Sequence, residues 1–359
     1  MEPFVQHAQV DGIATSHQDE SVSSRISVVI SAYTEARWRD LERAVASLRR
    51  QTLRPHQVVV VVDHNPALLA RVCEHMPFVV AVENREQRGL SGARNSGISA
   101  ASGEIIAFLD DDAEADRDWV ENIARSYGTD EVIAVGGSVE PHWLNGRPRW
   151  FPAEFDWVVG CTYRGMPERC TPVRNVIGAN MSFRREVFAE IGAFRSGIGR
   201  VGTRPVGCEE TELCIRAQRR RPGTVVLYEP SARVRHSVPP ERATWRYFRS
   251  RCFSEGLSKA LVARIAGAGD GLASERTYAL RTLPCGFFRG LLDGLLRRQS
   301  GGIPRATAIA AGLLITTGGY LVGTTWGLLR RASRQFEAGP EDASHPEPSR
   351  AGAWNTSRG

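Results

Sequence analysis

The stretch Ile105-Ile-Ala-Phe-Leu-Asp-Asp-Asp112 decides how the rest of the chain is interpreted. Its first five residues are apolar, which is typical of a short strand that is buried on both faces of a sheet. Three aspartates follow at once, and neighbouring carboxylates repel one another unless a cation relieves the repulsion. An aspartate triplet is also common in solvated turns, but directly after a buried strand it favours a ligand site.

Apolar strands alternate with amphipathic helices on both sides of this stretch. We expect strands at 26–31, 58–62, 79–82, 105–109 and 132–135, with helices at 38–48, 67–74, 90–101 and 119–127 between them. A strand at 180–183, helices at 184–191 and 210–220, and strands at 225–228 and 232–236 follow. This alternation predicts an α/β fold, with an open, mostly parallel, Rossmann-like sheet flanked by helices.

Chemically distinctive side chains stand where the expected strands end. Ala32, Tyr33 and Glu35 follow the first strand, Asp63 follows the second, and the aspartates follow the fourth. Ligands of open parallel sheets bind at the carboxyl ends of the strands, so we expect these residues to share one edge. Mg²⁺ and Mn²⁺ prefer oxygen ligands and commonly bind carboxylates together with substrate phosphates. The sequence therefore predicts a Mg²⁺ or Mn²⁺ site that also takes a phosphorylated ligand.

The segment Gly89-Leu-Ser-Gly-Ala-Arg-Asn-Ser-Gly97 leads into an expected helix. Free backbone N–H groups at a helix start favour anions, and Arg88 and Arg94 can add charged hydrogen bonds to phosphate. A close-packed helix start that requires small residues would give the same pattern. Both interpretations stay open at this stage.

These segments, taken in order, resemble the inverting glycosyltransferases of family 2, of the bacterial non-processive type, which have the GT-A fold. The resemblance spans about residues 24–240 and rests on 26–35, 58–63, 89–97 and 108–112. It implies that Tyr33 stacks on the base of a nucleotide-sugar donor and that Asp63 hydrogen-bonds this base. It also implies that Asp110 or Asp111 holds the ribose or phosphate side, and that Asp112 ligates the metal.

A second group of acids, Cys208-Glu-Glu-Thr-Glu212, opens the expected helix at 210–220. Inverting transfer needs a carboxylate that deprotonates the acceptor hydroxyl. Family members commonly carry Glu-Asp here, with the Asp as base, so the resemblance implies Glu210 as the base and leaves Glu209 as the other candidate. Glu210 is one methylene longer than the expected Asp. Acids also favour the first turn of any helix, which is the alternative explanation.

His236 ends the expected strand at 232–236. The resemblance to GT-A enzymes implies that it completes the metal or diphosphate site, with Asp112 and Asp110. A lone histidine in the core or on the surface is the alternative.

Two other functions remain open. A sugar-1-phosphate nucleotidyltransferase would need a glycine-rich loop after the first strand, and residues 31–38 contain no glycine. A non-catalytic nucleotide-sugar-binding module would explain Glu210 in the place of the usual Asp. A dehydrogenase is disfavoured because no GxGxxG follows the first strand.

Composition narrows the partners and the compartment. The net charge of +6 comes almost wholly from arginine, with Lys259 as the only lysine, and we expect no nucleic-acid partner. The seven cysteines form no CxxC pair and no zinc-ligand spacing, which predicts free thiols in the cytoplasm. The expected partners are a nucleotide-sugar donor, preferably a UDP-sugar, and a glycan, lipid-linked or small-molecule acceptor.

Residues 306–329 form a run of 24 residues without charge between Arg305 and Arg330. The run is long enough to cross a bilayer, which takes about 20 residues. Attachment to the inner face of the plasma membrane is one interpretation, and a glycine-rich helix packed on the catalytic domain is the other. The expected organisation is a disordered leader (1–24), a catalytic domain (25–238), a helical extension (239–300), an apolar helix (303–331) and a disordered tail (332–359).

Overall fold

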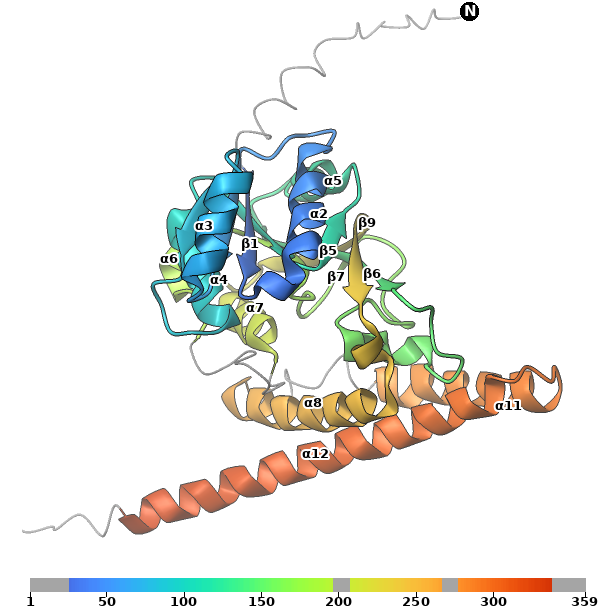
Figure 1. Ribbon diagram of the computed structural model, residues 1–359. Helices are drawn as coiled ribbons and strands as arrows, with labels where there is room; N and C mark the ends of the chain where they lie inside the picture. Colours follow the sequence, from blue (N-terminus) through green and yellow to red (C-terminus); the bar gives the residue numbers. More distant parts are fainter. Residues whose placement is uncertain (1–25, 196–206, 267–276, 338–359) are drawn as a thin grey trace, which may run out of the picture.

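The structure is a computed structural model that describes residues 26–195, 207–266 and 277–337 (Figure 1). The predicted leader (1–24) lies outside the described residues, as does the predicted tail (332–359) beyond residue 337; its first residues, 332–337, continue helix α12 (Gly302–Glu337). The other elements that the sequence predicts are present, and the fold is an α/β fold in which helices flank a central sheet.

The first half of the sheet is parallel, as the sequence predicts. Its strands are β1 (Ile26–Ala32), β2 (Gln57–Val62), β3 (Val80–Glu83) and β4 (Ile105–Asp110), in the order β3-β2-β1-β4. The connecting helices are α2 (Trp38–Arg49), α3 (Pro66–His75) and α4 (Leu90–Ala100), with the short 3₁₀ helix η1 (Glu35–Arg37) before α2. Helix α5 (Trp119–Ser126) follows β4 and the short strand β5 (Ala113–Ala115).

The second half of the sheet is mixed, so the parallel arrangement does not continue beyond β4. Strand β8 (Asn180–Arg184) lies antiparallel to β4 and to β6 (Val132–Trp143), whereas β6 runs parallel to β9 (Val225–Val238). Strands β5 and β7 (Thr171–Pro172) pair antiparallel with β9. Strand β6 is much longer than the predicted 132–135, and β9 joins the two strands predicted at 225–228 and 232–236.

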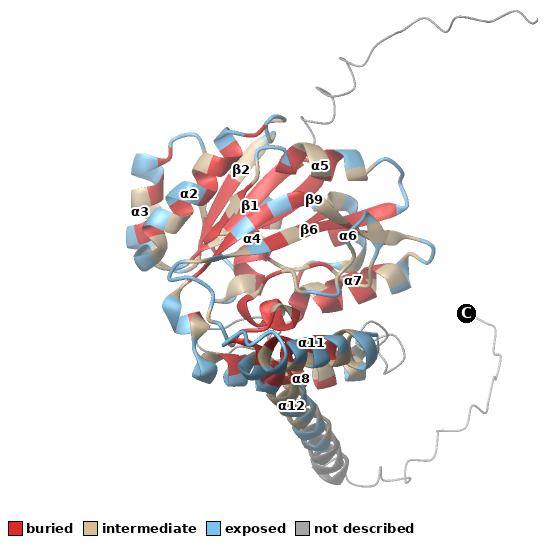
Figure 2. Cartoon of the chain, turned by 90° about the vertical axis from the view of Figure 1, so that its right-hand side faces the viewer, coloured by how far each residue is buried: buried red, intermediate tan, exposed pale blue. Residues whose placement is uncertain are grey.

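Two apolar clusters cover the two faces of the sheet, and the central strands are buried on both sides (Figure 2). Val28 and Ile30 of β1 belong to the cluster under α2, α3 and α5, and Val29 belongs to the cluster on the other face. Helices α6 (Arg185–Ile191) and α7 (Glu209–Arg220) also contribute to that second cluster. This two-sided burial explains why the strands of the first half are runs of apolar residues without alternation.

A helical layer lies below the sheet domain (Figure 1). It consists of η3 (Pro240–Ala243), α8 (Trp245–Ala266), the π-helix η4 (Tyr278–Thr282), α11 (Leu283–Leu295) and α12 (Gly302–Glu337). Helix α12 packs along α8 and α11. The aromatic segment before it, which includes η2 (Ala153–Val159), packs onto this layer, because Phe151 and Phe155 are buried against Phe248 of α8.

Candidate active site

The predicted donor-binding residues lie at neighbouring strand ends. Ser31 of β1 is opposite Asp110 of β4 in the register, and the backbone N–H of Asp63 donates to the carbonyl oxygen of Ala32 at 2.8 Å. Ala32 is buried, whereas Tyr33 beyond it is 54% exposed. The sheet therefore brings the ends of β1, β2 and β4 to one edge, with an open aromatic face beside the aspartates.

Strand β5, which the sequence analysis missed, places His236 beside the aspartates. Ala113 of β5 is opposite His236 of β9, and the N–H of Ser237 donates to the carbonyl oxygen of Asp112 at 2.8 Å. Nε2 of His236 consequently lies 3.0 Å from Oδ1 of Asp112, and both side chains are buried. A pairing over more than a hundred residues thus creates the histidine–aspartate contact.

Asp112 is held ionised by its surroundings. Burial acts to raise its pKa, but His236, Arg37 and Arg242 outweigh this effect and hold the pKa well below its usual range. Nη1 of Arg37 lies 3.2 Å from Oδ2 of Asp112, and Nη2 of Arg242 lies 3.5 Å from the same oxygen. Asp112 is therefore ionised, which is the form that ligates a divalent cation.

Asp111 differs from its two neighbours. Its side chain is buried, and Oδ1 accepts a hydrogen bond from Nη1 of Arg37 at 2.8 Å. Burial and the charge of Asp112 raise the pKa of Asp111 to about 7, although Arg37 opposes them. Among the described residues, Oδ2 of Asp111 has no hydrogen-bond partner. The carboxylate of Asp111 thus faces Arg37. Its role in donor binding stays a prediction.

Asp110, Asp112 and His236 form a group that fits one divalent cation. One ligand atom from each lies within 4.8 Å of the others, and Asp110 is 31% exposed where it faces the edge. Neighbouring ligands of a six-coordinate ion with bonds of roughly 2.1 Å lie about 3 Å apart. The 3.0 Å between Nε2 of His236 and Oδ1 of Asp112 matches that spacing.

Arg94 connects the aspartates to the acids of α7. Its buried guanidinium lies 2.8 Å from Oε1 of Glu209 and 3.6 Å from Oδ1 of Asp110, and it donates to the carbonyl oxygen of Gly178 at 3.0 Å. Arg94 was predicted to bind phosphate; in the structure its guanidinium is paired with these protein groups. The glycines around it are closely packed, since a Cβ at Gly92 would lie 2.0 Å from the carbonyl oxygen of Gln87. This packing supports the steric interpretation of the 89–97 segment.

Glu209 and Glu210 differ in environment at the start of α7. Glu209 is buried and paired with Arg94, whereas Glu210 is half-buried. Burial, followed by the charge of Glu209, raises the pKa of Glu210 to about 8, and Glu255 of α8 adds to this while Arg94 opposes it. Cys208, directly before the helix, has a φ of 78°, in the left-handed region that non-glycine residues rarely adopt.

Among the other residues predicted to bind the donor, Asp63 and Arg88 take part in one hydrogen-bond network. The carboxylate of Asp63 accepts hydrogen bonds from Asn84 Nδ2 at 2.6 Å and from the backbone N–H of Gly89 at 3.0 Å, and it lies 2.8 Å from His64 Nδ1. Arg88 donates to the carbonyl oxygen of His64 at 3.1 Å. Asp63 thus ties the end of β2 to the start of α4. Glu35 is exposed in η1, and the guanidinium carbon of Arg37 lies 5.4 Å from the centre of the Tyr33 ring.

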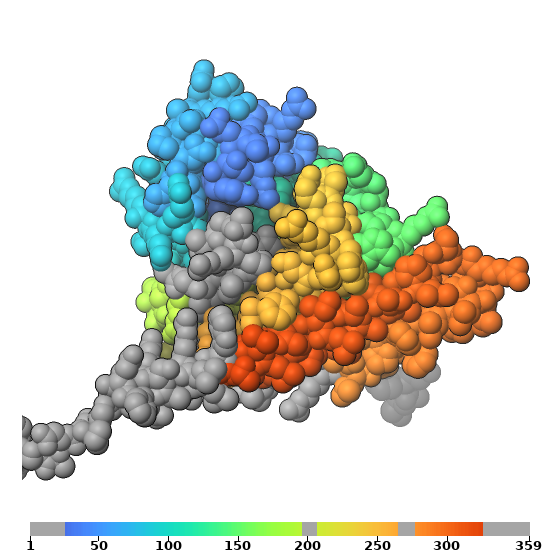
Figure 3. Space-filling model, turned by 60° about the horizontal axis from the view of Figure 1, so that its bottom comes forward, coloured from blue at the N-terminus to red at the C-terminus, as the bar shows by residue number. Residues whose placement is uncertain are grey.

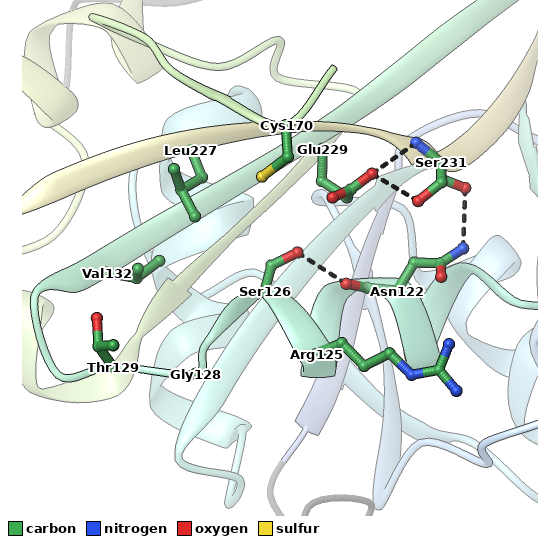
Figure 4. Close-up of a pocket in the computed structure, with 10 residues that line it drawn as sticks. All are labelled: Asn122, Arg125, Ser126, Gly128, Thr129, Val132, Cys170, Leu227, Glu229 and Ser231. Carbon is green, nitrogen blue, oxygen red and sulfur yellow. Dashed lines mark hydrogen bonds between the residues drawn. The ribbon is translucent and has the colours of Figure 1, made fainter.

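A pocket elsewhere on the molecule contains none of the predicted residues (Figure 4). It has a volume of about 460 Å³ and lies beside α5 and β9. Its lining residues are Asn122, Arg125, Ser126, Gly128, Thr129, Val132, Cys170, Leu227, Glu229 and Ser231. The carboxylates at the sheet edge, and not this pocket, define the candidate site.

The fold and the site define an α/β protein with a carboxylate cluster at the edge of its sheet, and comparison with known proteins identifies the family. Residues 27–192 match the model described as glycosyl transferase family 2. The chain is 37% identical over 242 residues to the glucosyl-dolichyl phosphate glucuronosyltransferase of Haloferax volcanii, which covers 66% of this chain and 77% of that protein. It is 25% identical over 236 residues to the succinoglycan biosynthesis protein ExoM of Rhizobium meliloti, covering 64% and 72% of the two chains.

A solved structure supports the same fold. The mannosyltransferase PcManGT from Pyrobaculum calidifontis, in complex with GDP-Man and Mn²⁺, aligns with a TM-score of 0.54 and 18% identity, covering 84% of this chain and 87% of that one. The chain therefore belongs to glycosyltransferase family 2. It is a glycosyltransferase with the GT-A fold, which confirms the predicted family and sets aside the nucleotidyltransferase and the non-catalytic module.

Proposed function

We propose that this protein transfers a sugar, with inversion, from a nucleotide-diphosphate donor to a hydroxyl of a lipid-linked acceptor. The observation that carries the proposal is the group of Asp110, Asp112 and His236, whose ligand atoms lie within 4.8 Å of one another at the carboxyl edge of the sheet. A UDP-sugar is the preferred donor. The lipid-linked acceptor draws support from the name of the Haloferax volcanii relative; a glycan or a small molecule is the alternative.

The cation is proposed to bind to Asp110, Asp112 and His236. A set of two carboxylates and one imidazole suits Mn²⁺ better than Mg²⁺, which rarely takes nitrogen ligands. When bound, the ion neutralises negative charge on the diphosphate as it leaves the sugar. Arg37 and Arg242 keep Asp112 ionised, so the ligand is ready for the ion without losing a proton first.

Tyr33 and Glu210 are proposed to act on the two substrates. The ring of Tyr33 is exposed at the end of β1 and can stack on the donor's base, beside the Asp63 network. Glu210 takes the proton from the acceptor hydroxyl as its oxygen attacks the anomeric carbon. The Arg94–Glu209 pair holds the first turn of α7, and with it Glu210, in position relative to Asp110.

The protein is proposed to work in the cytoplasm and at the membrane. Within the described residues, Gly302–Thr325 is the one helix that is long and apolar enough to cross a bilayer, judged by length and composition. All seven cysteines lie in described segments and are free thiols, as expected for a reducing compartment.

The direct test is nucleotide release by the purified full-length protein from a panel of UDP-, GDP- and dTDP-sugars, with Mn²⁺, Mg²⁺ or EDTA. We expect release from one class of donor with Mn²⁺, less with Mg²⁺, and none with EDTA. Undiminished release in EDTA, or by Asp112→Asn in Mn²⁺, would refute the metal assignment.

A further inference from the structure

Helix α11 exposes several large apolar side chains. Phe288, Leu292 and Leu295 are 62%, 51% and 64% exposed, and Leu296 just after the helix is also exposed. The buried residues of α11 are Leu283, Gly286, Gly290 and Asp293, and Phe287 packs partly buried against the core. A helix on the surface of a soluble protein normally turns polar side chains outward. Phe288, Leu292 and Leu295 therefore point away from the protein, where a binding partner or a medium less polar than water would cover them.

Helix α12 continues this apolar surface. From Ala306 to Thr325 it carries no charged residue, and Leu313, Leu314 and Leu321 are exposed. Only 28% of its most apolar window is buried inside the protein. Figure 3 shows α11 and α12 together at the surface on the lower side of the molecule. Exposed apolar surface of this extent marks an interaction site.

The inner face of α12 is fixed along the catalytic domain. A Cβ at Gly312 would lie 2.4 Å from the ring of Phe155, and one at Gly319 would lie 2.2 Å from the carbonyl oxygen of Phe253 in α8. Figure 1 shows α8 between the sheet domain and α12. Such backbone contacts along the helix leave it lying against the domain, so it cannot cross a bilayer without losing them.

Arginines lie beside the apolar face of α11. Residues 277–305 contain five arginines and one acid, Asp293. Asp293 is paired with Arg297 and Arg305, and Nη1 of Arg289 lies 3.8 Å from Oε1 of Glu154. The side chains of Arg289 and Arg297 are nevertheless 51% and 70% exposed. Apolar side chains flanked by arginines are complementary to the interface of an anionic bilayer, which attracts basic groups and accepts aromatic and aliphatic ones.

We infer that the outer faces of α11 and α12 bind in the interface of an anionic lipid bilayer, with α12 lying in the membrane plane and not crossing it. The surface comprises Phe288, Leu292, Leu295, Leu296, Leu313, Leu314 and Leu321, which we call the membrane face.

Helices α8 and α12 lie between the membrane face and the start of α7, which carries the proposed base. The backbone N–H of Gly207, just before α7, donates to Oγ of Ser258 in α8 at 3.4 Å. On the other side of α8, a Cβ at Gly256 would lie 2.1 Å from the carbonyl oxygen of Thr316 in α12. Packed helices lie about 8–10 Å apart, so the start of α7 lies about two such spacings from the axis of α12, and an acceptor reaches the base only if its polar head extends from the interface past these helices. This step rests on the proposed function and assigns the acceptor to the class of membrane-embedded lipids with a polar, hydroxyl-bearing head.

Vesicle flotation tests the membrane face with the full-length protein. We expect the wild type to float with vesicles of phosphatidylcholine and phosphatidylglycerol, and less with phosphatidylcholine alone. The double variant Leu292→Glu/Leu314→Glu should bind at least about tenfold more weakly. Leu144→Glu is the matched control, because Leu144 is 49% exposed but lies outside the membrane face, and it should bind like the wild type. A wild type that does not float, or a double variant that floats equally well, overturns the inference.

Cys285 gives a second measurement that needs no substitution. It is exposed on α11, and Cys73 is exposed on α3. Anionic vesicles should slow the labelling of Cys285 by a charged maleimide and leave the labelling of Cys73 unchanged. Equal rates for Cys285 with and without vesicles would contradict contact at α11.

The orientation of α12 is tested with a cleavable tag after Gly359, in membrane vesicles from expressing cells with the cytoplasmic side outward. A helix in the plane leaves the tag open to added protease, whereas a crossing helix protects it. A protected tag overturns the in-plane arrangement. If the wild type is a dimer, the double variant is a monomer, and neither protein floats with vesicles, the membrane face instead binds a second copy of the chain.

Nucleotide release separates this inference from the proposed function. Both Leu292→Glu/Leu314→Glu and the wild type should release nucleotide equally in solution with Mn²⁺. Flotation without nucleotide release from any donor would support the membrane face and refute the proposed function. Nucleotide release without flotation would support the proposed function and refute the membrane face.

Discussion

Nη1 of Arg94 lies 2.8 Å from Oε1 of Glu209, and this buried pair joins the two halves of the candidate site. Arg94 also reaches Asp110 on the metal side, at 3.6 Å, while Glu209 begins the helix that carries Glu210. The two side chains are only 3% and 6% exposed. A charge at this depth is stable only while its partner is present.

Removing one partner of this pair should therefore unfold the protein more easily. We expect Arg94→Met to lower the free energy of unfolding by about 3 kcal/mol, because it leaves Glu209 buried and uncompensated. Urea denaturation measures the change, and the double variant Arg94→Met/Glu209→Met should recover a large part of it. A single variant as stable as the wild type would show that the pair is not structural.

The activity should rise with pH through the titration of Glu210. A general base must be ionised, and a pKa raised to about 8 leaves only roughly a tenth of Glu210 ionised at pH 7. The rate of transfer should thus increase from pH 7 to pH 9 and then level off. The pH profile of kcat/KM measures this, and a flat profile over that range would argue against Glu210.

Substitutions at the two glutamates distinguish which one is the base. Glu210→Gln should reduce kcat by about 10²–10⁴-fold, the usual contribution of a general base. Glu209→Gln keeps a hydrogen-bond acceptor for Arg94, and Asp110 still lies 3.6 Å from that guanidinium, so the variant should be less stable but active. Because it lacks the charge that raises the pKa of Glu210, its pH profile should move to lower pH. Loss of activity in Glu209→Gln together with an active Glu210→Gln would assign the base to Glu209.

Arg37 should contribute most to thermal stability when no metal is bound. It contacts Asp111 and Asp112, and without it the two buried carboxylates lose their shared cation. Arg37→Ala should melt at a lower temperature than the wild type without metal and gain a larger increase in Tm when Mn²⁺ is added. Equal Mn²⁺-induced shifts in the two proteins would contradict a shared electrostatic role.

His236 should contribute to metal affinity, which calorimetry with Mn²⁺ measures. His236→Ala removes one of three ligands and should weaken binding by more than about tenfold. His142→Ala is the control, because His142 is exposed on the neighbouring strand β6 and should bind Mn²⁺ as the wild type does. Unchanged affinity in His236→Ala would remove this residue from the metal site.

The strands that carry the donor side could be predicted from the sequence because each is a run of apolar residues. Residues 26–31, 58–62 and 105–109 all fall within β1, β2 and β4. The extension of β6 to Trp143 could not be predicted, since Gly136, Gly137 and Pro141 interrupt its apolar pattern. The direction of β8 could not be predicted either, because a buried strand has the same composition whether it runs parallel or antiparallel to its neighbours.

The ion pairs within the site could not be predicted from the sequence. Tyr33, Asp63 and the aspartates could be found because they follow strands directly. Arg37 and Arg242 were missed, although three adjacent aspartates indicate that some nearby cation must compensate them. The contact between Arg94 and Glu209 joins residues 115 positions apart, and only the folded sheet brings them together.

The measurement that tests the central claim most directly is anomalous diffraction from crystals of the full-length protein grown with Mn²⁺ and UDP. The account predicts a manganese peak within bonding distance of Asp112 and His236, with Asp110 beside it and the diphosphate of UDP on its open side. A peak elsewhere, or UDP bound at the sheet edge without manganese at these residues, would contradict it.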